Sequence, residues 1–240
     1  MSLFIIPMAG LSSRFFKAGY TKPKYQLMLK DESIFSWSVR SFEKYFETDT
    51  FIFVYRDIYN TKEFIEKEIS HLGIKNFHLV CLDKETLGQA DTVYQGLKHI
   101  EADDEVYIFN IDSKIINFIK PKWVNSCDGY LEVFKGEGDH WSFALAEENT
   151  LKVIKTAEKE RISDFCSDGL YYFSKKSLFE NAFLKAKAKN EKVKEEFYIA
   201  PLYNTLIREN NTILYDLINI ENILFCGTPE EYLDILEKQK

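Results

Sequence analysis

Two basic side chains and a small-residue loop near the start of the chain could hold a polyphosphate. The apolar run Leu3–Ile6 predicts a short buried strand, and Pro7–Ser13 follows it with small and hydroxyl-bearing residues. Backbone N–H groups in such a loop are unpaired and can bind an anion. Arg14 adds a planar fork of donors, and Lys24, next to a proline, adds a point charge. The stretch therefore predicts a polyphosphate-binding loop.

Two other phosphate-binding loops match this stretch less well. A Walker loop ends in Gly-Lys-Ser/Thr, and no such tripeptide follows Gly10. A dinucleotide fingerprint needs three spaced glycines, whereas this loop has one. A plain connection from strand to helix with scattered basic residues remains the alternative.

A carboxylate after a later predicted strand could bind a divalent metal. Asp112 lies just beyond the apolar run Val106–Phe109, and ligands bind at the carboxyl ends of parallel strands. Close to a triphosphate, this aspartate would hold Mg²⁺ through one bond, with phosphate oxygens and waters as the other ligands. The alternative is an aspartate that only shapes a turn.

The first loop resembles the signature of the nucleotidyltransferases that make sugar nucleotides, commonly G-x-G-[ST]-R-[LF] followed by P-K. The chain carries AGLSSRF at Ala9–Phe15 and then Pro23 and Lys24. Ser12 stands where many members have a second glycine, which predicts a stiffer loop. The resemblance implies that the loop backbone and Arg14 hold the triphosphate, and that Lys24 lies between the α-phosphate and the acceptor phosphate.

Later segments resemble further parts of the same family, in the family's order. Thr86–Thr92 is similar to its L-G-T-A segment beneath the nucleobase, where Gly88 would allow close backbone approach. Ala157–Lys159 resembles its acceptor-binding E-K pair, and Asp168–Phe173 resembles its G-[IL]-Y-x-F strand. Glu196–Ile199 resembles an acceptor-side segment, although the start of an amphipathic helix explains these residues better.

The resemblance implies a set of site residues and Mg²⁺ as the cofactor, with Asp112 as its ligand. The implied catalytic residues are Arg14, Lys24 and Asp112; the nucleotide-binding residues are Met8, Ala9, Gly10, Leu11, Ser12, Ser13, Asp83, Gly88 and Gln89; the acceptor-binding residues are Glu158, Lys159, Gly169 and Glu196.

One position departs from the family pattern. Gly227–Glu230 resembles the family's G-T-P-E at the C-terminal helix, and many members carry a second metal-binding aspartate two residues before that glycine. Phe225 occupies this position, and an apolar side chain cannot replace a ligand. The metal is therefore expected to be held by Asp112 and the phosphates, and to bind the free protein weakly. Among the carboxylates before Phe225 in sequence, the nearest candidates are Asp216 and Glu221.

The spacing of apolar residues predicts the elements that position these groups. Short apolar runs alternate with helical patterns in the first half of the chain, which predicts parallel β-α-β units. Strands are expected near 3–6, 51–55, 77–82, 106–109, 129–134, 142–146, 151–154, 170–173, 213–217 and 223–225, and helices near 35–46, 64–72, 89–99, 177–187, 197–208 and from 229 onward.

The expected fold class is α/β, with a Rossmann-like, three-layer, mixed and mostly parallel sheet. The resemblance implies the GT-A-like nucleotidyltransferase version of this fold. We expect a single domain over residues 1–240, with a nucleotide-binding half at about 1–120 and an acceptor-binding half at about 121–240.

Composition narrows the class of protein further. A hydrophobic fraction of 45% with 29% charged residues is ordinary for a globular protein, and a net charge of −7 argues against a nucleic-acid partner. The aromatic fraction of 15% indicates a bulky core first and a base-stacking surface second. The four cysteines and four histidines have no metal-like or C-x-x-C spacing, so we expect a cytoplasmic protein without disulfides or zinc. No stretch approaches the roughly 20 apolar residues of a membrane span.

These patterns predict transfer of a nucleotidyl group from an NTP to a phosphorylated acceptor, with release of pyrophosphate. The resemblance implies a sugar 1-phosphate or a small non-sugar phosphate such as phosphocholine as the acceptor, and a product used for surface polysaccharide. One alternative is a glycosyltransferase with Asn110–Asp112 as its metal motif; Arg14 and Lys24 disfavour it, because a nucleoside-diphosphate donor has no γ-phosphate. Another is a non-catalytic nucleotide-binding module, motivated by Phe225. The sequence does not identify the base of the NTP or the acceptor, and it leaves open whether the chain forms a homo-oligomer.

Overall fold

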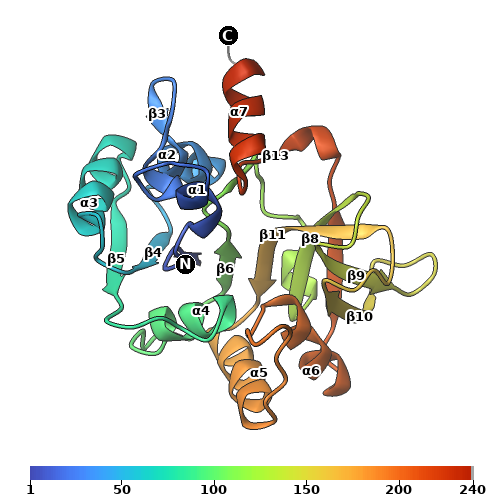
Figure 1. The fold of residues 1–240 in the computed structure, drawn as a ribbon. Coiled ribbons are helices and arrows are strands. Elements are labelled where there is room, and N and C mark those ends of the chain that lie inside the picture. The colour runs from blue at the N-terminus through green and yellow to red at the C-terminus, as the bar shows by residue number, and fades with distance from the viewer. Residues whose placement is uncertain (239–240) are drawn as a thin grey trace.

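A computed structural model describes residues 1–238 of the chain (Figure 1). Its strands are β1 Leu3–Pro7, β2 Met28–Leu29, β3 Glu32–Ser33, β4 Thr50–Tyr55, β5 Asn76–Cys81, β6 Val106–Phe109, β7 Ser113–Ile115, β8 Gly129–Lys135, β9 Ser142–Ala146, β10 Val153–Glu158, β11 Phe165–Phe173, β12 Ile213–Leu217 and β13 Ile223–Phe225. Its α-helices are α1 Ser13–Lys17, α2 Ile34–Val39, α3 Thr61–Leu72, α4 Gln89–Leu97, α5 Lys176–Ala188, α6 Tyr203–Arg208 and α7 Pro229–Lys238.

The described strands form a nine-stranded sheet in the order β5-β4-β1-β6-β11-β9-β10, with β8 also paired to β11 and β12 paired to β8. The first half is parallel, since β1 pairs in parallel with both β4 and β6, and β4 with β5. β11 then enters antiparallel to β6 and joins the second half to the first. The predicted α/β fold with a mixed, mostly parallel sheet is confirmed.

Side chains along the central strands alternate between the two faces of the sheet, which accounts for the high aromatic content. One face buries aromatic rings, namely Phe4, Phe51, Phe53, Tyr107 and Phe109. The other buries aliphatic side chains, namely Leu3, Ile5, Ile52, Val54, Val106 and Ile108. Because both faces are covered, these strands are continuous apolar runs, as is typical of a parallel sheet.

Helices on both sides of the sheet complete the three layers. α2 and α3 cover the aromatic face through side chains such as Phe35 and Ile65. α4, α5 and α6 cover the aliphatic face through Val93, Phe179 and Leu206, and they lie together at the bottom of Figure 1. Within residues 1–238, no helix is long and apolar enough to cross a membrane.

Three expected elements differ from the structure in the second half, and the strand expected near 170–173 is β11, which begins at Phe165. The strand expected near 151–154 is β10, which continues to Glu158. The helix expected over 197–208 becomes α-helical only at Tyr203. Phe197 instead bonds to the segment before α4: its N–H donates to Leu87 O at 2.7 Å, and its carbonyl accepts from Ala90 N at 2.9 Å. Tertiary hydrogen bonds have replaced the first helical turn.

Candidate active site

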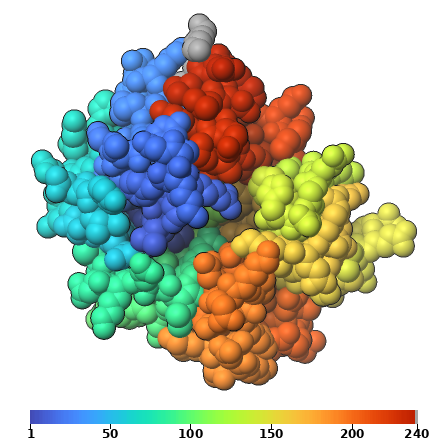
Figure 2. Space-filling view, viewed as in Figure 1, coloured from blue at the N-terminus to red at the C-terminus, as the bar shows by residue number. Residues whose placement is uncertain are grey.

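A cavity of about 790 Å³ opens where the two halves of the sheet meet. Figure 2 shows this hollow between the blue N-terminal segment, the red C-terminal helix and the yellow and orange second half. Of the residues expected to form a site, its wall includes Ala9, Gly10, Leu11, Ser12, Ser13, Arg14, Lys24, Gly88, Gln89, Asp112, Glu158, Lys159, Gly169 and Glu196. Met8 is instead buried in the core, and Asp83 lies outside the cavity wall.

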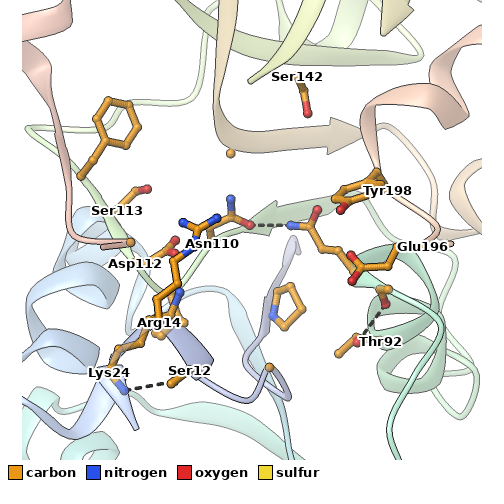
Figure 3. A pocket seen from close by; sticks show the side chains of 18 of the residues that line it. Ser12, Arg14, Lys24, Thr92, Asn110, Asp112, Ser113, Ser142, Glu196 and Tyr198 are labelled. Carbon is orange, nitrogen blue, oxygen red and sulfur yellow. Dashed lines mark hydrogen bonds and ion pairs between the residues drawn. The ribbon is translucent and has the colours of Figure 1, made fainter. Parts of the chain in front are cut away.

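The loop after β1 is suited to an anion. Among the described residues, none accepts a hydrogen bond from the backbone N–H groups of Ala9–Arg14. Ser12 adopts a left-handed conformation with φ 51°, which glycine adopts at lower cost. Its hydroxyl accepts a hydrogen bond from Lys24 N at 3.1 Å, so the departure from glycine ties the loop to this lysine (Figure 3). The exposed Arg14 side chain extends into the cavity beside them.

Lys24 and Asp112 meet in the middle of the cavity wall. The Lys24 ammonium donates to Asp112 Oδ2, and both side chains are partly buried. Lys24 comes from a short helical turn after the first loop, whereas Asp112 follows β6 at the carboxyl edge of the sheet. The pair therefore joins the two segments that sequence spacing predicted to act on phosphate.

The surroundings of Asp112 fit a magnesium ion better than a softer metal. Asp112 supplies carboxylate oxygens, which Mg²⁺ prefers. Gly227 lies beside Asp112 and has no side chain. A Cβ added there would lie 3.0 Å from Asp112 Oδ2, so glycine leaves open a space that any other residue would fill. Within residues 1–238, no cluster of three or more His, Cys, Asp or Glu side chains is arranged to hold a metal by itself. Such an ion would therefore need water or ligand oxygens as well.

The segment before α4 is held close to the second half of the chain. Gly88 has φ 113°, and an added Cβ would lie 2.6 Å from the backbone nitrogen of Phe197, so only glycine fits. The close approach expected at Gly88 is thus made by the protein's own backbone. Next to it, the Gln89 amide donates to Asn110 Oδ1, and both residues line the cavity.

A second polar cluster lines the opposite end of the cavity, at the end of β10. Glu158 accepts a hydrogen bond from the Ser142 hydroxyl, and its Oε1 lies 3.7 Å from Lys159 Nζ. Burial raises the pKa of the Glu158 carboxyl, and the Ser142 hydrogen bond and the Lys159 charge oppose that shift. Lys159 Nζ also donates to the Tyr198 hydroxyl and lies 4.3 Å from the centre of its ring. A carboxyl and an ammonium are therefore held side by side.

A buried pair of carboxyl groups lies behind this cluster. Asp168, at an irregularity in β11, lines the cavity, and Glu132 on β8 lies in the interior; each is 2% exposed. Burial raises the pKa of Asp168 to about 7 and raises the pKa of Glu132 well above its usual value. Glu132 Oε1 and Asp168 Oδ2 are buried, and no residue within 1–238 donates a hydrogen bond to either, so ionising both carboxyl groups would leave two unpaired charges in the interior. The pair therefore retains a proton near neutral pH.

Because of this buried carboxyl pair, we expect the free energy of unfolding to fall as the pH rises. A carboxyl whose pKa is higher in the folded state binds more protons folded than unfolded, so the free energy of unfolding falls from about pH 4 to pH 7 and above. Asp168→Asn makes one of the two buried groups uncharged at every pH, while Oδ1 still accepts from Leu170 N. We expect the variant to be more stable than wild type at pH 8, by on the order of 1 kcal/mol or more, and to gain less at pH 5. Denaturant unfolding at both pH values measures this, and parallel pH profiles would contradict it.

Several cavity residues were not expected from the sequence. Ser142, Tyr198 and Asp168 reach the wall through strand pairing and loop packing between distant segments. Glu231 lines the cavity from the first turn of α7. The only local signal for Glu231 is its spacing from Thr228, which matches a capping box and indicates a helix start rather than a site.

Comparisons with solved structures agree with this architecture. The chain is 45% identical to the nucleoside-diphosphate-sugar pyrophosphorylase from Vibrio cholerae RC9, with a TM-score of 0.94 over 98% of this chain and 99% of that one. Two more distant structures share the fold: a UDP-glucose pyrophosphorylase complexed with UDP-glucose (16% identity, TM-score 0.75, 100% of this chain and 98% of that one), and the inositol-1-phosphate CTP transferase from T. maritima (15%, 0.73, 99% and 95%). No family model and no curated protein matches the sequence.

The fold is an α/β sheet with a polar cavity at the carboxyl edge of its parallel strands. Within this fold class, the chain belongs to the sugar-phosphate nucleotidyltransferase family, since it shares nearly half of its residues with a relative over almost the whole length of both chains. It is a nucleotidyltransferase, which transfers a nucleotidyl group from an NTP to a phosphorylated acceptor.

Proposed function

We propose that an NTP binds at the loop after β1 and a sugar 1-phosphate binds at the Glu158–Lys159 end of the same cavity. The observation that carries the proposal is the Lys24–Asp112 contact, since it lies in one cavity with both the anion-binding loop and the second polar cluster. In this arrangement residues 1 to about 120 form the nucleotide-binding half of a single domain, and the following residues form the acceptor half.

The reaction needs positioning more than proton transfer. An acceptor phosphate is already ionised near neutral pH, so its oxygen can attack the α-phosphorus while the bond to the β-phosphate oxygen breaks and pyrophosphate leaves. Arg14 holds the departing phosphates, Lys24 neutralises charge that develops at the α-phosphate, and Lys159 orients the acceptor phosphate. Asp112 would hold Mg²⁺, which supplies further neutralisation of phosphate charge when bound.

The acceptor end of the cavity is suited to a sugar. Glu158 can accept hydrogen bonds from sugar hydroxyls, and Glu196 adds a second carboxylate to the wall. The Vibrio cholerae relative is named for nucleoside-diphosphate sugars, which supports the same class of product. We propose that the product is a precursor of surface polysaccharide.

A small cationic phosphate ester such as phosphocholine is a second candidate acceptor. The Trp141 and Phe225 rings both line the cavity, with their centres 4.9 Å apart. Exposed aromatic faces attract quaternary ammonium groups through cation–π contacts. Cytidylyl transfer to such an acceptor would use the same phosphate chemistry.

Pyrophosphate release tests the proposal. The purified chain is incubated with Mg²⁺ and each common NTP, alone and with a panel of sugar 1-phosphates and phosphocholine. We expect release that depends on both substrates, with one NTP strongly preferred. Release from NTP alone, or no release with any pair, would contradict the proposed reaction.

A further inference from the structure

The segment between β13 and α7 lies beside Asp112. β13 pairs antiparallel with β7, which sets Phe225 opposite Ser113, and the next N–H, that of Cys226, donates to Asp112 O at 2.7 Å. Gly227 therefore lies beside the Asp112 carboxylate although it is distant in sequence. The pairing of β13 with β7 therefore brings the first turn of α7 close to Asp112, the proposed metal ligand.

A second carboxylate, that of Glu231, lies on the other side of Gly227. A Cβ added to Gly227 would be 3.0 Å from Asp112 Oδ2 and 3.6 Å from Glu231 Oε2, so both oxygens lie close to one point. Gly227 has no side chain, and the space between the two carboxylates is therefore not filled by the residue that separates them. Glu231 also lines the cavity, as Asp112 does.

The backbone holds Glu231 in this position. Its Oε2 accepts hydrogen bonds from Gly227 N at 2.8 Å and Thr228 N at 3.0 Å, and Thr228 Oγ1 accepts from Glu231 N at 3.2 Å. This is a capping box, which on its own would explain a glutamate here. Both bonds to the carboxylate use Oε2, and no residue within 1–238 donates to Oε1. One oxygen of a fixed carboxylate is thus left for another partner.

We infer that Glu231 supplies the second protein carboxylate for the divalent cation, acting with Asp112 directly or through a metal-bound water. The inference rests on the proposed function. It accounts for Phe225, because the carboxylate that the family pattern leads one to expect at 225 comes instead from the first turn of α7. The two carboxylates that most closely precede Phe225 in sequence do not fit, because Asp216 on β12 and the exposed Glu221 both lie outside the cavity wall.

The contact between Lys24 and Asp112 makes cation binding at the Asp112–Glu231 site depend on bound nucleotide. In the free protein, the Lys24 ammonium already bonds to Asp112 Oδ2 and offsets its charge. A triphosphate offers Lys24 other oxygens and brings ligands of its own. The free protein therefore binds the cation weakly, and the complex with nucleotide binds it tightly.

Mn²⁺ titration followed by electron paramagnetic resonance tests the inference without turnover. The full chain is titrated with Mn²⁺ alone, and again with the α,β-methylene analogues of ATP, CTP, GTP, UTP and dTTP in turn. Glu231→Gln removes the charge but keeps an oxygen that can accept the capping bonds. Glu230→Gln makes the same change at the exposed neighbour and serves as the control.

We expect the wild-type chain to bind Mn²⁺ more weakly than micromolar when alone and far more tightly with the analogue it accepts. Glu231→Gln should raise the Mn²⁺ Kd of that complex by roughly tenfold or more, a loss typical of a metal-supporting carboxylate, while Glu230→Gln leaves it within about twofold. Gly227→Ala, whose methyl group fills the space between the two carboxylates, should raise the Mn²⁺ Kd of the complex in the same way.

Two results overturn the inference in distinguishable ways. If an analogue binds but the Mn²⁺ Kd is the same in Glu231→Gln as in wild type or in Glu230→Gln, Glu231 has no role with the metal and the proposed function stands. If no analogue binds the wild-type chain at all, the proposed function fails, and the inference fails with it.

Discussion

Lys24→Ala is expected to lower kcat by about 10²–10³-fold, a loss of roughly 3–4 kcal/mol, while NTP binding changes much less. Negative charge builds at the transferring phosphoryl group only as the reaction proceeds, so a cation placed there stabilises the transition state more than the bound substrate. The contact of Lys24 with Asp112 puts its ammonium beside the proposed metal ligand rather than at the outer phosphates.

Steady-state kinetics and equilibrium nucleotide binding separate these effects. Lys22→Ala is the matched control, because Lys22 lies on the same loop but is exposed and outside the cavity wall. We expect the control to retain its kcat and KM. A Lys24→Ala variant that loses kcat/KM through KM alone would show a binding role and would contradict the role assigned to Lys24.

Asp112→Asn is expected to abolish Mg²⁺-dependent turnover, by roughly 10³-fold or more, without unfolding the protein. Asparagine has the same shape, and its carbonyl oxygen can still accept from Lys24. The backbone bond from Cys226 N to Asp112 O does not depend on the side chain. The loss therefore reports on charge and metal binding rather than on packing.

The measurement is turnover across a range of Mg²⁺ concentrations, together with the thermal unfolding midpoint. Asp234→Asn on α7 is a control for loss of one surface carboxylate, since Asp234 is exposed and outside the cavity wall. Near-normal activity of Asp112→Asn at ordinary Mg²⁺ concentrations would place the metal elsewhere.

Local sequence patterns were sufficient for the parallel strands of the first half, but not for β7. The strands at Leu3–Pro7, Thr50–Tyr55 and Val106–Phe109 are apolar on both faces, so they had to be internal strands of a covered sheet. Parallel pairing then brings the loop after β1 and Asp112 after β6 to one edge. This is why the positions of Arg14 and Asp112 in one cavity could be predicted.

The unpredicted features depend on contacts between distant segments. Nothing near Glu231 in sequence shows that β13 pairs with β7 and brings it to Asp112. Glu132 and Asp168 become a buried carboxyl pair only because β8 and β11 are neighbours. Phe197 starts no helix, because its backbone is bonded to the segment that includes Gly88. Such pairings are set by packing that local spacing does not encode.

The fate of the acceptor's phosphate oxygens tests the central claim most directly. An acceptor labelled with ¹⁸O on its three non-bridging phosphate oxygens is converted with the preferred NTP, and the products are analysed by ³¹P NMR and mass spectrometry. The proposed attack at the α-phosphorus predicts that all three labels remain in the nucleotide-linked product, one of them in the bridge between its phosphates, and that the released pyrophosphate carries none. Label in the pyrophosphate, or a nucleotide product with an unlabelled bridge, would contradict it.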